Sequence, residues 1–317
     1  MRKPLYFLFF PQISILLFIS SWLLPFLGSF LCFVFFLPLL FAYYSLEKRN
    51  FLLSFLISLL IFIFFPKLFP LYITALLIFV FPLIWGIKKY SSHGRRIIFI
   101  LCLSFILGGI IATPFCIFNK ARITSIITYI QEQTKKTEED LIKNYEKKGI
   151  SGDEIEQLKI LLKKVEKLVF NLMPSMFLLV MGGSIFIHYY FLSKFLYFHN
   201  LEKEAFPGPE NWRLPFFIVW IFILSSFLLF LSRNIPPQYI SLLSINLVFL
   251  SVSLILLEGL GILHFFLLKV KCPWILMIFV YFIVLLQPLF IALLFLFGLL
   301  DFWIDFRKIS SKKSQVM

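Results

Sequence analysis

The sequence predicts an all-α fold: a polytopic transmembrane helical bundle of about nine spans (eight to ten), with one soluble helical hairpin inserted between the fifth and sixth. Composition is the first reason, because 61% of the 317 residues are apolar and 15% are charged, against about 45–50% and about 25% in soluble domains. The second is the segregation of charge, because nine of the 16 acidic residues lie between Glu132 and Glu166. We therefore expect a lipid bilayer to surround most of this chain.

Residues 1–118 hold the first five predicted spans. A helix needs about 20 apolar residues to cross a hydrocarbon core of about 30 Å at 1.5 Å per residue. The runs that approach or reach this length are residues 5–28, 30–46, 51–66, 68–87 and 97–118. No small-residue cleavage site follows the first run, so we interpret it as a retained helix and not as a signal peptide.

Residues 119–172 are predicted to form a soluble amphipathic helical hairpin. Gly149 suits the end of its first helix, and Ser151 with Glu154 fits the S-x-x-E capping box that begins a second one. Apolar residues recur at helical spacing on both sides of this turn: Ile123, Ile126, Ile127, Ile130, Leu141, Ile142 and Tyr145, then Ile155, Leu158, Leu161, Leu162, Val165, Leu168 and Val169. Two interpretations stay open, a solvated extension that packs on itself and an element that binds a partner or acts as a lid.

Residues 173–306 supply the sixth to ninth predicted spans, in the runs 173–195, 214–232, 238–268 and 274–300. The last two runs exceed the length of a single crossing, so they must tilt strongly or be interrupted. Pro288 lies at the centre of the last run and can divide it into two half-helices. Residues 307–317 form a basic tail.

Loop charge predicts a cytoplasmic N-terminus and an external hairpin. In that orientation the short outer loops between spans hold only Lys67 and Arg233. The inner segments hold Arg2, Lys3, Lys48, Arg49, Lys88, Lys89, Arg95, Arg96, Lys194, Lys203, Arg213, Lys269 and Lys271. The tail disagrees, because nine crossings would place Arg307 and the lysines after it outside. A re-entrant or doubled final segment returns the tail to the cytoplasm.

Glu258 is the leading candidate for a functional residue within the membrane. An ionisable side chain at mid-bilayer costs at least about 2.5–3.5 kcal/mol, so each one is a candidate site. Glu258 lies about ten residues before the Lys269 end of its span, near the midplane, and precedes Gly259. It is either a ligand or cation contact, or a protonated or paired carboxyl that only holds helices together.

Gln287 and Asn246 complete the candidate ligand-binding set. Gln287 precedes Pro288, where its amide can satisfy backbone groups that the proline frees or can coordinate a solute. Asn246 lies less deep in its span. His188 and His264 are within about two helical turns of a loop, so we expect both to reach interfacial water.

Neither catalysis nor a metal is expected. The four histidines stand in separate regions, and the chain has no H-E-x-x-H, Walker A or G-x-G-x-x-G motif. Ser184 and His188 are four residues apart but lack a third group to orient them. We therefore predict no enzyme, no catalytic residue and no cofactor. Nucleic-acid binding is not expected either, because short basic loops beside apolar spans are typical of membrane topology.

The segment from Gly298 to Arg307 carries the pattern Gly-x-x-Asp-x-Trp-x-Asp-Phe-Arg. In this pattern the chain resembles the YybS-like family, uncharacterised multi-spanning bacterial membrane proteins. The likeness covers nearly the whole chain by organisation and the C-terminal third by motif, with support from Trp212-Arg213-Leu214-Pro215, Trp220 and Gly259. The resemblance implies a bacterial cytoplasmic (inner) membrane location, and glutamine at the position of Glu258 in many relatives.

Four residues of this pattern, Asp301, Trp303, Asp305 and Arg307, are candidate motif or interface residues at a membrane boundary. They form either a local ion pair with an aromatic anchor, or a docking motif for a cytoplasmic partner. The resemblance also implies a distant similarity to the substrate-capture components of energy-coupling factor transporters and to a rod-shape membrane protein of cell-wall elongation.

Two functions follow as expectations. The first is a component that captures or transports an unknown small molecule. The alternative is a non-enzymatic membrane scaffold that recruits envelope or cell-wall partners. The lipid bilayer is the expected partner in both cases, and a membrane or cytoplasmic protein is a candidate second one.

Overall fold

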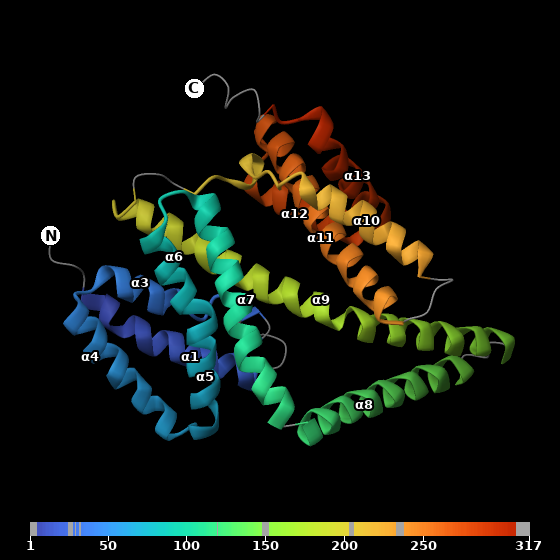
Figure 1. Ribbon diagram of the computed structural model, residues 1–317, viewed down its shortest axis with the longest axis horizontal. Coiled ribbons are helices and arrows are strands. Elements are labelled where there is room, and N and C mark those ends of the chain that lie inside the picture. Colours follow the sequence, from blue (N-terminus) through green and yellow to red (C-terminus); the bar gives the residue numbers. More distant parts are fainter. Residues whose placement is uncertain are drawn as a thin grey trace. The chain divides into compact units, whose positions relative to one another are not determined.

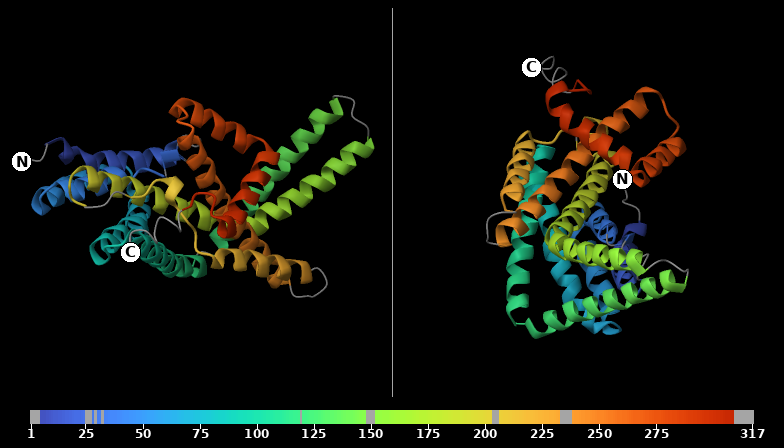
Figure 2. Two further views of the ribbon diagram at one scale, coloured as in Figure 1. Left: turned by 90° about the horizontal axis from the view of Figure 1, so that it is seen from above. Right: turned by 90° about the vertical axis from the view of Figure 1, so that its right-hand side faces the viewer.

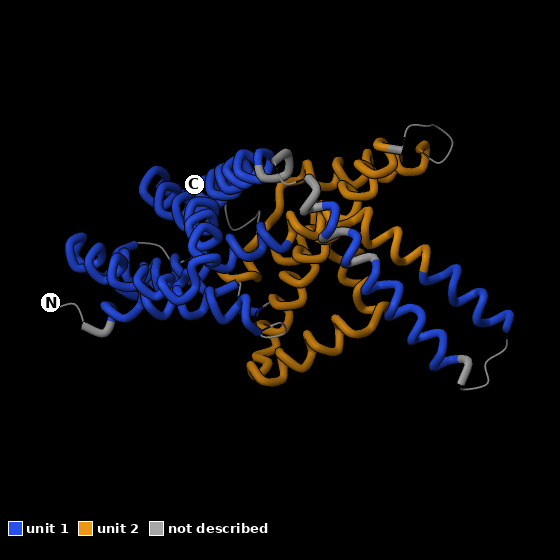
Figure 3. The backbone as a smooth tube through the Cα atoms, turned by 90° about the horizontal axis from the view of Figure 1, so that it is seen from below, with its two compact units in different colours: residues 1–162, 180–206 blue, residues 163–179, 207–317 orange. Residues whose placement is uncertain are grey.

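The computed structural model of this protein describes residues 5–24, 28, 30–31, 33–118, 120–147, 152–202, 206–232 and 238–308. All regular elements in this described part are helices, which confirms the predicted all-α class. The chain forms two compact units, Met1–Leu162 with Val180–Phe206 and Lys163–Leu179 with Pro207–Met317 (Figure 3).

Unit 1 is built from many short helices and two long ones. In chain order they are η1 (Leu5–Phe9), α1 (Phe10–Leu23), α3 (Leu37–Ser45), α4 (Lys48–Leu59), η2 (Leu60–Ile63), η3 (Pro66–Leu68), α5 (Phe69–Ala75), the π-helical η4 (Leu76–Val80), α6 (Phe81–Lys89), α7 (His93–Phe118) and α8 (Lys120–Lys147) (Figure 1). α1 packs against α3 and α4, and α7 packs against α6. The core between them includes the fully buried Ile15, Leu40 and Leu83.

The second predicted span, 30–46, is interrupted at residues 33–36, which form turns before α3 begins at Leu37. Side chains satisfy the backbone there, since Ser14 Oγ donates to the carbonyl of Phe35 (2.8 Å) and the Phe36 N–H donates to His188 Nε2 (3.3 Å). His188 is fully buried and its Nδ1 lies 2.8 Å from the Ser184 carbonyl. The expectation that His188 reaches interfacial water is therefore wrong, because its ring replaces a missing helical hydrogen bond.

By the length and composition of helices in the described residues, four or five membrane spans are supported, so the expected nine are not confirmed. Four stretches are long and apolar enough to cross a membrane, Pro66–Lys89, His93–Pro114, Gly152–Phe198 and Tyr239–Lys269. A fifth is added if α12 (Trp274–Leu286) and α13 (Pro288–Ile304) count as one bent span. Phe7–Leu23 and Phe217–Leu231 are shorter apolar helices. An apolar run shows that a segment prefers lipid, but prolines and turns decide whether it forms one continuous helix.

Helix α9 (Gly152–Phe198) is 47 residues long and runs through both units, with its middle in unit 2 and its ends in unit 1 (Figure 3). It is continuous across residue 172, where we placed the boundary between the hairpin and the sixth span. α8 and the start of α9 are helical, as the hairpin prediction requires. Its turn, with Gly149 and Ser151, lies outside the described residues.

Unit 2 is organised around α11 (Gln238–Lys269), which packs against α10 (Phe217–Leu231) and α13 (Pro288–Ile304). A 3-10 turn, η5 (Pro209–Asn211), also contacts α11. α12 (Trp274–Leu286) and α13 meet at 101° (Figures 1 and 2). The predicted division at Pro288 is confirmed: Gln287 is extended (φ −101°, ψ 114°), because a residue before proline avoids the helical conformation.

Candidate functional site

Helices α11 and α13 approach each other closely at two glycines. A Cβ atom on Gly259 would overlap the carbonyl oxygen of Leu294, and one on Gly298 would overlap the carbonyl oxygen of Ile255. Small residues allow helix backbones to approach within a membrane protein, where van der Waals packing drives association. This crossing places Glu258 of α11 beside the end of α13.

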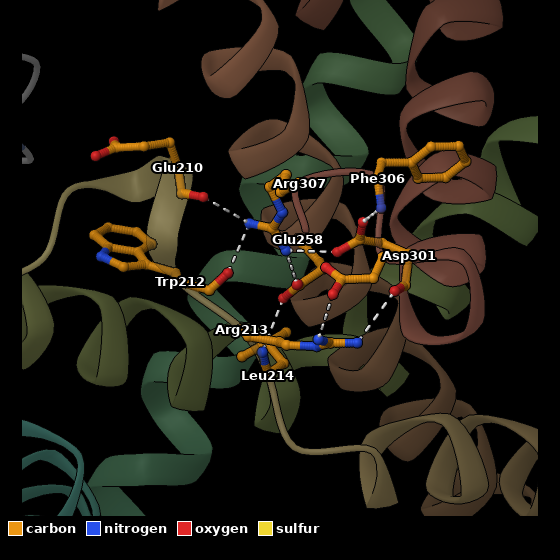
Figure 4. Close-up of polar contacts among 9 residues, drawn as sticks. Glu210, Trp212, Arg213, Leu214, Glu258, Asp301, Phe306 and Arg307 are labelled. Carbon is orange, nitrogen blue, oxygen red and sulfur yellow. Dashed lines mark hydrogen bonds and ion pairs between the residues drawn. The ribbon is translucent and has the colours of Figure 1, made fainter. Parts of the chain in front are cut away.

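Arg307 occupies the centre of a buried ionic cluster at this crossing (Figure 4). Its Nη2 pairs with Glu258 Oε1 and with Asp301 Oδ2, the latter at 2.7 Å. The three side chains are almost completely shielded, with exposed fractions of 0% for Arg307, 2% for Glu258 and 1% for Asp301. Buried charges of this kind require partners, because removing one partner leaves the other charge unpaired at a cost of about 3–5 kcal/mol.

The turn after α13 aims Arg307 into the cluster. Asp305 has a left-handed backbone (φ 49°, ψ 61°) that ends the helix, and the N–H of Phe306 donates to Asp301 Oδ1 at 2.8 Å. The chain thereby reverses, and Arg307 reaches back over the last turn of α13. Asp301 thus caps the turn and pairs with Arg307 at the same time.

The segment before α10 closes the cluster on its other side. The N–H of Leu214 donates to Glu258 Oε2 at 2.9 Å, and Arg307 Nη1 donates to the carbonyl of Trp212 at 2.7 Å. Arg213 Nη1 lies 3.4 Å from Asp305 Oδ2. The sequence indicates this segment only as support for the family motif. Its role in the cluster is not predictable from residue types, since every residue has an N–H or a carbonyl.

A family model described as predicted membrane protein (DUF2232) matches residues 12–302 of the chain. The chain belongs to the DUF2232 family. No curated protein and no solved structure matches it. The match supports a membrane protein of unknown function, and it covers Glu258 and Asp301 but ends before Asp305 and Arg307.

The candidate ligand-binding residues of this DUF2232 protein do not converge. Glu258 and Asn246 are 12 residues apart on α11, about 18 Å by helical rise. Asn246 bonds to α9, with Ser175 N–H as donor (3.0 Å) and the Asn171 carbonyl as acceptor (2.7 Å). The side chain of Gln287 is exposed at the bend. In the described part of the chain, Glu258 and Asn246 therefore do not share a site.

The motif residues behave differently from one another. Asp301 and Arg307 belong to the buried cluster, whereas Asp305 lies at its edge with Arg213. Trp303 is 58% exposed and its ring contacts Phe216 with centroids 5.8 Å apart. Two ion pairs, Arg307 with Asp301 and Arg213 with Asp305, are the contacts that the local ion-pair interpretation requires.

His264 forms a second polar contact group beside the cluster. Its Nδ1 lies 2.6 Å from the Tyr281 hydroxyl of α12, and its Nε2 lies 3.7 Å from Glu210 Oε2. The His264 side chain is 23% exposed, so part of its ring lies at the protein surface. Among the described residues, no group of three His, Cys, Asp or Glu side chains is placed to hold a metal ion.

A cavity of about 230 Å³ lies between α11, α12 and α13. Its lining is apolar: Gly259, Ile262, Leu263, Phe266, Val284, Phe290, Leu293, Leu294 and Phe297. Both halves of the bent pair contribute to it. The cavity can accept an apolar group of several carbon atoms, and it offers no polar side chain to a ligand.

Proposed function

We propose that this DUF2232 protein is a non-enzymatic membrane component that captures a small, largely apolar solute between α11, α12 and α13. The observation that carries the proposal is the apolar cavity of about 230 Å³ at the bend of α12 and α13. Ligand pockets are typically concave and mostly apolar, and broken helices frequently form the solute sites of transporters.

The ionic cluster supports this function by holding the wall of the cavity. Both oxygens of the Glu258 carboxylate accept hydrogen bonds from within the chain, one from Arg307 and one from Leu214. The carboxylate is therefore occupied and does not contact the solute in our proposal. Gly259, the next residue, lines the cavity and contacts Leu294, so the cluster fixes α13 beside the site.

The proposal includes a bacterial cytoplasmic membrane location, a cytoplasmic N-terminus and about nine crossings. Two contacts in unit 1 support a shared side for the loops that we expect to be cytoplasmic. Lys88 Nζ lies 2.5 Å from the Tyr43 hydroxyl, and Arg96 pairs with Glu202. These contacts gather the ends of α3, α6 and α9 and the start of α7 at one end of the unit, as expected if their loops face one side. We also propose that the chain is related to YybS-like proteins and, more distantly, to the substrate-capture components of energy-coupling factor transporters.

Ligand co-purification tests the proposal. The full chain, purified in mild detergent, is examined by native mass spectrometry and its extracted small molecules are identified. We expect a retained apolar compound, and we expect Leu263→Trp to lose it, because an indole fills the cavity. Phe279→Trp is the matched control, since Phe279 is 58% exposed and does not line the cavity.

Leu263→Trp should keep or raise the thermal stability, because filling a cavity restores packing contacts. A wild-type protein that carries no small molecule in any preparation, or a retained compound that Leu263→Trp does not displace, would overturn the proposal.

The scaffold function is a second candidate, favoured by the surface of α9. Leu161, Val165, Leu168 and Val169 lie at the spacing of one helical face and are 42–59% exposed. Lysines 159, 163, 164 and 167 lie around it, so the matching partner is a protein helix with an apolar stripe and acidic edges. A photocrosslinking residue at Val165 should give one defined adduct in cells, and the same residue at Lys163 should give none. Equal labelling at both positions counts against a scaffold.

A further inference from the structure

Helix α9 contains Pro174 at the junction between its charged and apolar parts. Proline has no N–H, so the carbonyl of residue 170 loses its helical donor, and the ring also crowds that carbonyl. Such positions weaken a helix and commonly bend it. α9 nevertheless continues through Pro174 without interruption.

The side chain of Asn246 lies at this weak point. Its Oδ1 accepts from the N–H of Ser175 (3.0 Å), and its Nδ2 donates to the carbonyl of Asn171 (2.7 Å). These two backbone groups are four residues apart, so they are the pair that would bond to each other in an uninterrupted helix. The Asn246 amide therefore connects the N–H and the carbonyl of one helical hydrogen-bonding pair in α9, from outside that helix.

Burial and secondary contacts strengthen this bridge. Asn246 is 8% exposed and Ser175 is fully buried. Nδ2 also donates to the carbonyl of Leu242 (2.8 Å), which holds the amide against its own helix α11. Ser175 Oγ donates to the carbonyl of Leu172 (2.9 Å). Three of the four hydrogen-bonding positions of the amide are thus used, and their geometry defines which atom is oxygen and which is nitrogen.

We propose that Pro174 is a hinge in α9 and that Asn246 is the clamp that holds this hinge at a fixed angle. The clamp sets the direction of residues 152–172, the charged arm of the helix, relative to the apolar part of the same helix. A change that withdraws α11 from α9 would release the arm. The clamp is independent of the proposed solute site, because none of the residues that line the cavity takes part in it.

Hydrogen exchange on the full chain in lipid nanodiscs tests the clamp. Asn246→Leu keeps the side-chain volume but removes both bonds to α9, so we expect the amides of residues 171–178 to exchange about tenfold faster. Asn246→Asp keeps the acceptor for Ser175 and loses the donor, and it should give an intermediate rate. Asn144→Leu on the exposed surface of α8 is the control and should change nothing.

A rescue experiment separates a hinge from general loosening. Pro174→Ala returns an N–H to the helix, so in the Asn246→Leu background it should restore slow exchange. Spin labels at Ile160 and Phe191, with the four native cysteines replaced by serine, should show a broader distance distribution in Asn246→Leu and a narrow one after the rescue. Unchanged exchange in Asn246→Leu, or no restoration by Pro174→Ala, would overturn the proposal.

Discussion

Arg307 and Glu258 form a buried ion pair across 49 positions of the sequence, between the turn after α13 and the middle of α11. The sequence predicts Glu258 near the membrane midplane and Arg307 at a membrane boundary, and their contact shows that the two side chains lie at one level of the protein. The crossing at Gly259 and Gly298 brings the end of α13 to the level of Glu258.

Arg307→Met should be the most damaging change in the cluster. It leaves Glu258 and Asp301 buried without their cation, which should lower the free energy of unfolding by about 3–5 kcal/mol. Denaturation of the purified protein in mixed micelles measures the loss. Lys308→Met, at the exposed neighbouring position, is the control and should stay within about 0.5 kcal/mol.

Glu258→Gln should be tolerated much better than Arg307→Met. Glutamine can still accept from the N–H of Leu214, and Arg307 keeps its pair with Asp301. In the wild type the carboxylates of Glu258 and Asp301 face one guanidinium, so the variant leaves one carboxylate paired with one guanidinium. We expect a loss of about 1–2 kcal/mol, in the range of one charge-assisted hydrogen bond. A larger loss than for Arg307→Met would contradict the described pairing.

Gly298→Ala should separate α11 from α13. The added methyl group would overlap the carbonyl oxygen of Ile255, which is backbone and cannot rotate away. We expect a loss of more than about 2 kcal/mol, in the range of overpacked cores. Gly109→Ala is the matched control, because a Cβ there meets nothing within 4 Å, and it should be neutral or slightly stabilising.

His188→Leu should destabilise unit 1. The Phe36 N–H would lose its acceptor in a buried site, at a cost of about 1–3 kcal/mol. Thermal unfolding measures the loss, and the exposed His199→Leu serves as the control. If both variants unfold at the wild-type temperature, the turn at residues 33–36 does not depend on the His188 ring.

Cysteine accessibility should reveal the orientation. In a background without native cysteines, Asn50→Cys and Ser91→Cys should react only with reagents that reach the cytoplasm, and Lys136→Cys should react from outside. The reason is the concentration of basic loops on the cytoplasmic side. A reporter fused after Lys308 should be cytoplasmic, and an external reporter would exclude a doubled final segment.

The helical class and the break at Pro288 could be predicted because they depend on local chemistry. Long apolar runs require a lipid environment, and proline cannot donate the hydrogen bond that would continue α12 into α13. Apolarity alone did not reveal that residues 33–36 leave the helix, because this depends on the side chains of Ser14 and His188 far away in the chain.

The candidate residues were found singly by their type, since an acid, an amide or an arginine in an apolar chain is conspicuous. Their grouping was not predictable. Glu258 and Asn246 were assigned to one ligand site, yet one pairs with Arg307 and the other bridges α9 beside Pro174. The backbone groups of Trp212 and Leu214 were not predicted at all, because every residue has an N–H and a carbonyl and only position distinguishes them.

By itself the sequence determined that this protein is helical, prefers lipid and carries a few costly polar groups in apolar segments. Only the tertiary structure decided how those groups are satisfied. Hydrophobic transfer is nearly additive over residues and can be summed along a chain, whereas an ion pair depends on the distance and direction between atoms that the fold brings together. Arg307 and Glu258 are partners because two glycines let α13 approach α11 and one left-handed residue turns the chain back.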